Sequence, residues 1–141
     1  MAALDTNVLV RLIVEDDPVQ VASAKKLLAR CILGNETLFV PITVSLELEW
    51  VLRSRFGFSK PLVIEALSRI LTAVELSFES ESALEIALVN YEQGTADYSD
   101  YLHLALAEKV NAQPLWTFDK AASKSTMDES IIHIGRLMSS K

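Results

Sequence analysis

The sequence predicts a single α/β domain with a mostly parallel central sheet. Its 141 residues fit one domain, and half of them are apolar, which is enough for a core without disulfides. Short apolar segments alternate along the chain with longer segments of helical periodicity, a pattern typical of parallel sheets. No repeat, linker or low-complexity segment interrupts this pattern, so residues 1–141 are predicted to form one domain.

The chain is predicted to open with a short buried strand over 2–6 and an apolar helix over 7–14. Asp17 and Pro18 fit the N-cap and the first position of a second helix, which ends before Gly34. The apolar residues of this helix recur at helical spacing: Val21, Ala24, Leu28 and Cys31.

The next part is predicted to pair two strands with two helices. Residues 38–42 form the second strand, and helices over 43–56 and 59–72 follow, with Gly57 between them. Alternating polar and apolar residues over 74–78 predict a third strand.

The second half continues the alternation of helices and strands. The predicted elements are helices over 80–93 and 98–111, a strand over 114–118, a short helix over 119–125 and a strand over 131–134. Gly94 follows the first of these helices and provides its C-terminal stop.

Composition and charge narrow the class of protein. Acids outnumber bases 19 to 13, which gives a net charge of −6. This is the wrong sign for a protein that binds nucleic acid through its overall charge. Cys31 is the only cysteine and is expected to be a buried thiol, which excludes an internal disulfide or a cysteine metal cluster. Because no apolar stretch of membrane length and no signal-peptide pattern is present, a reduced cytoplasmic setting is expected.

Aspartates occur where predicted strands end and helices begin. Asp5 closes the first strand, and Asp119 follows the strand over 114–118. Ligands of open α/β sheets bind at the carboxyl ends of the strands, so both carboxylates are candidates for a site there. Asp119 is equally well placed to cap the helix that it precedes. Asp97 and Asp100 share one face at the start of a helix, where carboxylates also satisfy free N–H groups.

The helix over 43–56 carries two acids, and a helical wheel separates them. Glu47 falls inside a broad apolar sector that includes Trp50 and Val51. Glu49 falls outside this sector, with Arg53 four residues later as the partner of a solvated ion pair. A buried carboxylate requires a partner or a cation, so the wheel favours Glu47 as a site acid. The alternative is a Glu47 bonded to the backbone or to an arginine.

Gathered carboxylates without neighbouring lysines or arginines either take up protons or bind a cation. Oxygen ligands suit Mg²⁺ or Mn²⁺, and no histidine spacing supports zinc. His103 and His133 are expected to be structural. No glycine-rich phosphate loop or dinucleotide fingerprint is present.

Four motifs taken together carry a resemblance to a known family. They are Leu4-Asp5-Thr6-Asn7, Ser45-Leu46-Glu47-Leu48-Glu49-Trp50, Ala96-Asp97-Tyr98-Ser99-Asp100 and Trp116-Thr117-Phe118-Asp119-Lys120. In this order and approximate spacing the chain resembles PIN-domain ribonucleases, in particular VapC-type toxins of toxin–antitoxin pairs, from Ala3 to about Ile134.

The resemblance implies a PIN-like α/β/α sandwich and a metal-dependent endoribonuclease that cleaves RNA phosphodiesters with metal-activated water. By position, it assigns the catalytic acids to Asp5, Glu47, Asp97 and Asp119. It assigns the Mg²⁺ or Mn²⁺ ligands to Asp5, Asp97, Asp100 and Asp119. The supporting polar residues would be Thr6, Asn7 and Thr117. The neighbouring bases Arg11, Arg53 and Lys120 are candidates for RNA contacts, with solvated surface charge as the alternative. A homodimer and a cognate antitoxin are expected from the resemblance alone.

Two other functions remain open from the sequence. A non-catalytic PIN-like module would bind a protein or RNA without cleaving it, although the full set of acids argues against this. A Mg²⁺-dependent phosphatase or phosphoacceptor domain would share the Asp5 position, but Asp5-Thr6-Asn7 lacks the second aspartate of haloacid-type phosphatases.

Overall fold

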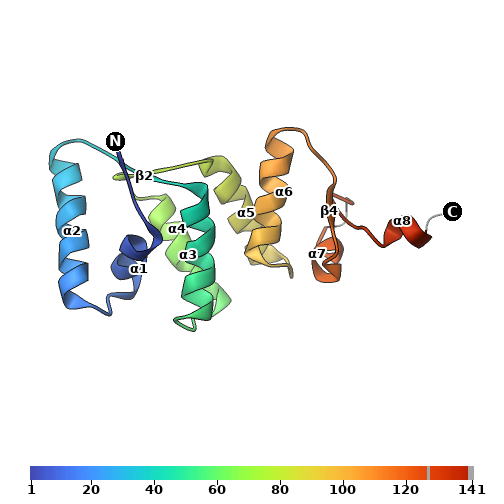
Figure 1. Cartoon of the computed structure of the whole chain (residues 1–141), viewed down its shortest axis with the longest axis horizontal. Coiled ribbons are helices and arrows are strands. Elements are labelled where there is room, and N and C mark those ends of the chain that lie inside the picture. The colour runs from blue at the N-terminus through green and yellow to red at the C-terminus, as the bar shows by residue number, and fades with distance from the viewer. Residues whose placement is uncertain (127, 140–141) are drawn as a thin grey trace. The chain divides into compact units, whose positions relative to one another are not determined.

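The computed structural model describes residues 1–126 and 128–139 (Figure 1). The chain divides into two compact units, an N-terminal unit of residues 1–81 and a C-terminal unit that begins at Ser82. Each unit contains parallel strands and helices. The predicted α/β class with parallel strands is therefore confirmed, and the strands form one small sheet in each unit.

The sheet of the N-terminal unit contains three parallel strands in the order β1-β2-β3. They are β1 (Ala2–Ala3), β2 (Leu38–Val40) and β3 (Leu76–Phe78). The prediction of a buried first strand is wrong, because both residues of β1 are exposed. This strand lies at the edge of its sheet, and burial begins only at Leu4, which follows it.

Four helices belong to the N-terminal unit: α1 (Thr6–Val14), α2 (Pro18–Leu33), α3 (Ile42–Ser54) and α4 (Lys60–Leu71). Helix α1 packs against α2 and α3, and its Leu9 and Val10 are buried. The predicted cap of α2 is confirmed, since the Asp17 carboxylate accepts the backbone N–H groups of Val19 and Gln20 at 3.2 and 3.1 Å. Cys31 is a buried free thiol, as predicted.

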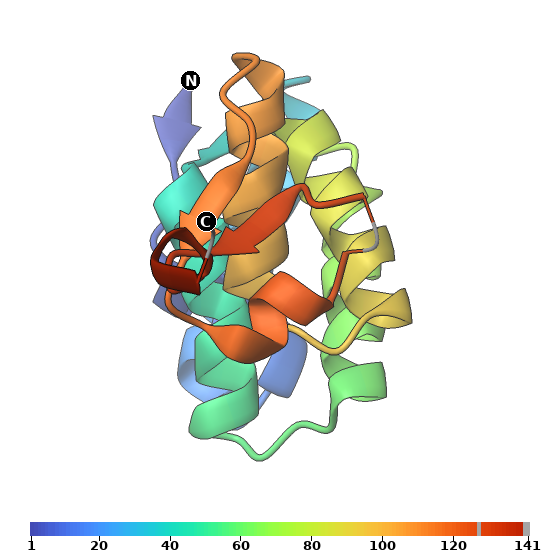
Figure 2. The same ribbon diagram turned by 90° about the vertical axis from the view of Figure 1, so that its right-hand side faces the viewer.

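The C-terminal unit pairs β4 (Leu115–Thr117) with β5 (Ile131–His133) in parallel (Figure 2). Its helices are α5 (Glu81–Gln93, whose first residue belongs to the other unit), α6 (Tyr98–Lys109), α7 (Lys120–Lys124) and α8 (Arg136–Ser139). Helix α7 packs against both strands. The single turn of α8 has no counterpart in the sequence prediction. No helix in the described part of the chain is long and apolar enough to cross a membrane.

Helix α3 buries a different acid from the one that the helical wheel selected. Glu49 is only 3% exposed, whereas Glu47 is exposed and Trp50 keeps 51% of its surface accessible. The wheel placed Trp50 inward because the side chain is apolar, and this rotated the expected buried face away from Glu49. The prediction of a buried Glu47 and a solvated Glu49 is therefore wrong.

Glu49 is tolerated inside because Arg53 lies one helical turn away. The guanidinium of Arg53 donates from Nε to Oε2 of Glu49 at 2.9 Å and from Nη2 to Oε1 at 3.4 Å. The predicted spacing of this pair is thus confirmed, although only the arginine remains in contact with solvent. A buried carboxylate is costly unless it is paired in this way.

Replacing Arg53 with methionine is expected to lower the free energy of unfolding by about 1–3 kcal/mol, because the buried Glu49 loses the cation that faces it. Urea unfolding measures this change. Arg69→Met is the matched control: Arg69 and Glu65 form the same i, i+4 pair at 3.0 Å with both side chains exposed. That loss should stay below about 0.5 kcal/mol. Equal losses for the two variants would contradict this account of Glu49.

Candidate metal centre

Three carboxylates of the C-terminal unit gather at one place. Asp97, Asp100 and Asp119 each offer an oxygen atom, and these atoms all lie within 4.8 Å of one another. Asp97 and Asp119 are exposed and Asp100 is half-buried. The two sequence motifs that carry these residues are therefore brought together, although about twenty residues of chain separate them.

Two of these carboxylates belong to the first turn of α6. Asp97 is the N-cap residue, and Asp100 lies three residues later on the same face. Oδ2 of Asp100 accepts the backbone N–H of Asp97 at 3.2 Å. The structural interpretation of this pair is thus correct, and it leaves further carboxylate lone pairs for a ligand.

The third carboxylate follows strand β4. Oδ1 of Asp119 accepts the backbone N–H of Ala122 at 3.1 Å and caps α7, as the capping interpretation predicts. The backbone N–H of Asp119 donates to Oγ1 of Thr117 at 2.9 Å. Thr117 therefore fixes the start of this turn, a role that fits the supporting position expected for it.

The surroundings of Asp100 in the cluster raise the pKa of its carboxyl group. Burial is the largest cause that raises the pKa of Asp100, and the negative charges of Asp119 and Asp97 raise it further. The hydrogen bond from the backbone of Asp97 and the nearby His103 lower this pKa without reversing the shift. An all-oxygen donor set of negative charges that repel one another fits a hard divalent cation such as Mg²⁺ or Mn²⁺.

Two further predicted site acids belong to the N-terminal unit. Asp5 lies beyond the carboxyl end of β1 and is the N-cap of α1, where Oδ1 accepts the backbone N–H of Thr6 at 2.6 Å. Glu47 is exposed on α3, the helix that packs against α1. Both carboxylates are accessible to solvent, so each can reach a ligand.

A buried hydroxyl group lies close in sequence to each of these two acids. Oγ1 of Thr6 and Oγ of Ser45 are both buried, and neither has a hydrogen-bond partner among the described residues. An unpaired buried hydroxyl lowers the free energy of unfolding by about 1–3 kcal/mol. Such groups are therefore unusual in well-packed proteins. Thr6 was a predicted supporting residue, whereas Ser45 was not singled out. Asn7, the third supporting residue, is exposed.

The three predicted RNA-contact residues differ in their availability. Arg11 donates to Gln20 at 2.5 Å and pairs with Asp16 at 3.1 Å. Arg53 is engaged with Glu49. Lys120, next to Asp119, is exposed, and its ammonium group contacts no carboxylate in the described chain.

The two histidines lie in different surroundings. His103 is exposed one turn after Asp100. His133 is half-buried on β5, and its Nδ1 accepts the backbone N–H of Gly135 at 2.9 Å, which agrees with the structural role expected for it. The ring of His133 meets that of Phe118 edge to face, with the centroids 6.2 Å apart. This aromatic contact was missed from the sequence, although Phe118 directly precedes a predicted site acid.

Comparison with known proteins identifies the family. The model of the PIN domain matches residues 2–125, most of the chain and all the motifs considered above. No curated protein matches the chain. PIN domains are in general metal-dependent nucleases, and the acidic cluster of the C-terminal unit fits this chemistry. On this match, the chain belongs to the PIN domain family.

Proposed function

We propose that this protein is a metal-dependent endoribonuclease and the toxin of a type II toxin–antitoxin module. The observation that carries the proposal is the gathering of Asp97, Asp100 and Asp119, with carboxylate oxygens within 4.8 Å, inside the region that matches the PIN domain. We further propose that it acts in the cytoplasm as a homodimer. Apart from the lack of a membrane-spanning helix among the described residues, this setting and assembly rest on the resemblance to VapC-type toxins.

The aspartates of the cluster would hold one or two Mg²⁺ or Mn²⁺ ions. A bound ion would supply positive charge for the phosphate oxygens and would lower the pKa of a water molecule that serves as the nucleophile. The carboxylates would orient this ion, and Oγ1 of Thr117 keeps Asp119 in place by accepting the backbone N–H of Asp119. A cluster of carboxylates alone repels a phosphodiester, so RNA binding and cleavage both depend on the cation.

We assign the acid on α3 to Glu47 and not to Glu49. Glu47 is exposed, whereas Glu49 is buried and bonded to Arg53, so its oxygens are already engaged. By the resemblance to the family, Glu47 and Asp5 are the catalytic acids that the N-terminal unit contributes, and each would accept a proton or ligate an ion. Lys120 is the base best placed to bind the RNA backbone, because Arg11 and Arg53 are paired within the protein.

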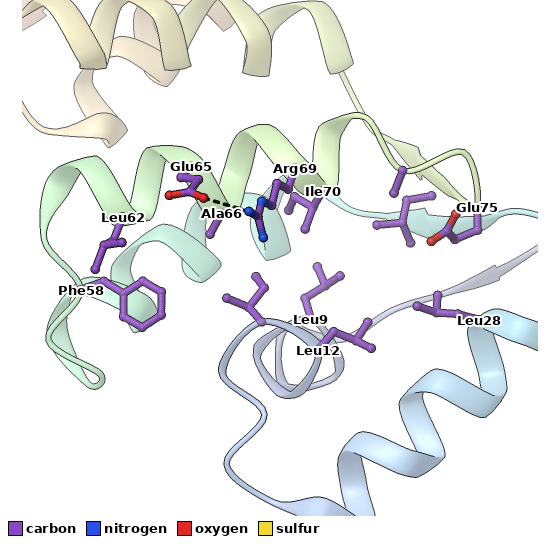
Figure 3. A pocket seen from close by; sticks show the side chains of 13 residues that line it. Leu9, Leu12, Leu28, Phe58, Leu62, Glu65, Ala66, Arg69, Ile70 and Glu75 are labelled. Atoms are coloured by element: carbon purple, nitrogen blue, oxygen red, sulfur yellow. Dashed lines mark ion pairs between the residues drawn. The ribbon is translucent and has the colours of Figure 1, made fainter.

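A groove in the N-terminal unit is the proposed docking site of the antitoxin (Figure 3). This groove of about 380 Å³ is lined mainly by apolar residues of α1, α2 and α4. Figure 3 shows Leu9 and Leu12 of α1 facing α4, while Leu62 lies toward one end and Glu75 toward the other. Among the described residues, the Glu75 carboxylate pairs with no cation. The groove therefore suits an amphipathic antitoxin segment with a basic residue opposite Glu75.

Asp97→Asn and Glu47→Gln are each expected to reduce RNA cleavage about 100-fold or more, because each removes a charge that holds or serves the cation. In the assay, the antitoxin-free protein is incubated with transfer and ribosomal RNA in Mg²⁺ or Mn²⁺. The rate at which discrete fragments appear on a gel is the measured quantity. EDTA should abolish the fragments.

Glu49→Gln is the matched control, since it changes the neighbouring acid on the same helix. It should lower stability while the fraction that remains folded keeps its cleavage rate. Wild-type cleavage by both Asp97→Asn and Glu47→Gln would reject the proposed site. Tight RNA binding in EDTA with no cleavage in Mn²⁺ would favour the binding-module alternative.

Leu62→Asp is expected to weaken the binding of the proposed antitoxin by about tenfold or more. Leu62 is half exposed at the groove, so the substitution should leave the fold intact. Val19→Asp on α2, an exposed residue outside the groove, is the control. Calorimetric titration measures both affinities, and equal affinities for the two variants would exclude the groove as the docking site.

A further inference from the structure

The turn between α5 and α6 carries Asp97 into the acidic cluster of the C-terminal unit. Helix α5 ends at Gln93, α6 begins at Tyr98, and Asp97 is the N-cap residue of α6. The start of the turn is tied to α5, because the backbone N–H of Gly94 donates to the carbonyl oxygen of Asn90 at 2.8 Å. The end of the turn bears the carboxylate, so a second attachment is needed there to hold that carboxylate in one position.

The side chain of Tyr101 provides this second attachment. Its hydroxyl oxygen, Oη, accepts the backbone N–H of Ala96 at 3.2 Å, and Tyr101 is only 2% exposed. Because Ala96 is buried as well, its N–H would lose its partner in a place with little access for water if the hydroxyl were removed. The next N–H along the chain, that of Asp97, donates to Asp100. Both N–H groups that lead into α6 are therefore bound by side chains of α6 itself.

Gly94 leaves the space that the hydroxyl of Tyr101 occupies. A Cβ atom at position 94 would lie 1.8 Å from Oη and 2.7 Å from Cζ of Tyr101, so any other residue would force the ring to move. Gly94 lacks the positive φ that would by itself favour glycine. The missing side chain at position 94 therefore serves the close approach of Tyr101 to the turn.

We propose that Tyr101 is a positioning residue of the metal centre, whose hydroxyl fixes the turn over 94–97 and thereby holds the Asp97 carboxylate within the cluster. This role of Tyr101 depends on the proposed function, because it requires the acidic cluster to hold a cation. Tyr101 would contact neither the ion nor the substrate and would act through Asp97. Groups that orient metal ligands in this way contribute about 10- to 100-fold to metal affinity.

Filling of the hydrophobic interior is the competing role for a buried tyrosine. Tyr101→Phe separates the two roles, since it keeps the ring and removes only the hydroxyl oxygen. Leu84→Val is the matched control: Leu84 is 1% exposed on α5, and trimming its side chain lowers stability through packing alone. Urea unfolding gives the stability change of each variant, and binding is measured under conditions in which each variant is fully folded.

Calorimetric titration of the whole chain with Mn²⁺ is the direct test. Tyr101→Phe should raise the Kd for Mn²⁺ about tenfold or more, whereas Leu84→Val should leave it within about twofold of the wild-type value. Gly94→Ala should also raise this Kd, because the added Cβ displaces Oη of Tyr101 from the N–H of Ala96. An unchanged Kd in Tyr101→Phe, or an equal rise in the Leu84→Val control, would overturn the proposal.

Amide hydrogen exchange followed by NMR examines the turn without any metal. The N–H of Ala96 should be protected in the wild type and should exchange about tenfold faster in Tyr101→Phe. The N–H of Leu115, which donates to the carbonyl oxygen of Ser130 at 2.8 Å, is the internal reference and should keep its exchange rate. An Ala96 N–H that is unprotected in the wild type would show that Tyr101 does not hold the turn.

The two proposals fail in different ways. A wild type that neither binds Mn²⁺ nor cleaves RNA would reject the metal-dependent nuclease, and with it any metal ligand for Tyr101 to position. A wild type that binds Mn²⁺ and cleaves RNA, together with an unchanged Kd in Tyr101→Phe, would reject the role of Tyr101 and leave the nuclease intact.

Discussion

Mutual repulsion among three carboxylates is the main physical constraint on the candidate metal centre of the C-terminal unit. Asp97, Asp100 and Asp119 each present an oxygen within 4.8 Å of the others, and their charges raise the pKa of Asp100 beyond the effect of its burial. The fold offsets part of this cost at helix starts. Asp97 and Asp119 are N-cap residues of α6 and α7, where the free N–H groups and the helix dipole favour negative charge. In the proposed site a divalent cation would offset the remainder, so residues that cap helices would also serve as metal ligands.

Helix α3 carries two neighbouring acids in opposite surroundings. Glu49 is buried and neutralised by Arg53, and Glu47 is exposed two residues earlier. Two residues along a helix correspond to about 200° of rotation, so the side chains point in nearly opposite directions. Only one of them can therefore face the interior, and the one that remains outside is the one available for a cation or a proton.

Local signals made most of the fold predictable. Asp17-Pro18 fits a helix start, Gly34 and Gly94 follow helix ends, and the strands coincide with short apolar segments. The failures have a tertiary origin. Trp50 is apolar yet half exposed, and this inverted the helical wheel of α3. The exposure of β1 follows from its edge position, which depends on strand order and has no signature in two alanines.

The candidate site was predictable only in part, because motifs give residues but no distances. Asp97 and Asp100 share a helical turn, so their proximity follows from helix geometry. The approach of Asp119 depends on how β4 packs against α6, and the contact of Phe118 with His133 depends on the pairing of β4 with β5. Both are long-range features that a single sequence does not encode in any local pattern.

The unfolding temperature with and without Mn²⁺, for the wild type and Asp100→Asn, tests most directly whether these carboxylates form a cation site. The folded state raises the pKa of Asp100, so its stabilising contribution is present below the unfolded pKa and is lost as the pH rises through the folded pKa. In EDTA at neutral pH, Asp100→Asn should therefore be at least as stable as the wild type, and its advantage should shrink on acidification. Mn²⁺ should stabilise the wild type clearly and the variant little. A wild type that gains nothing from Mn²⁺, or a variant that is less stable than the wild type in EDTA, would contradict the account.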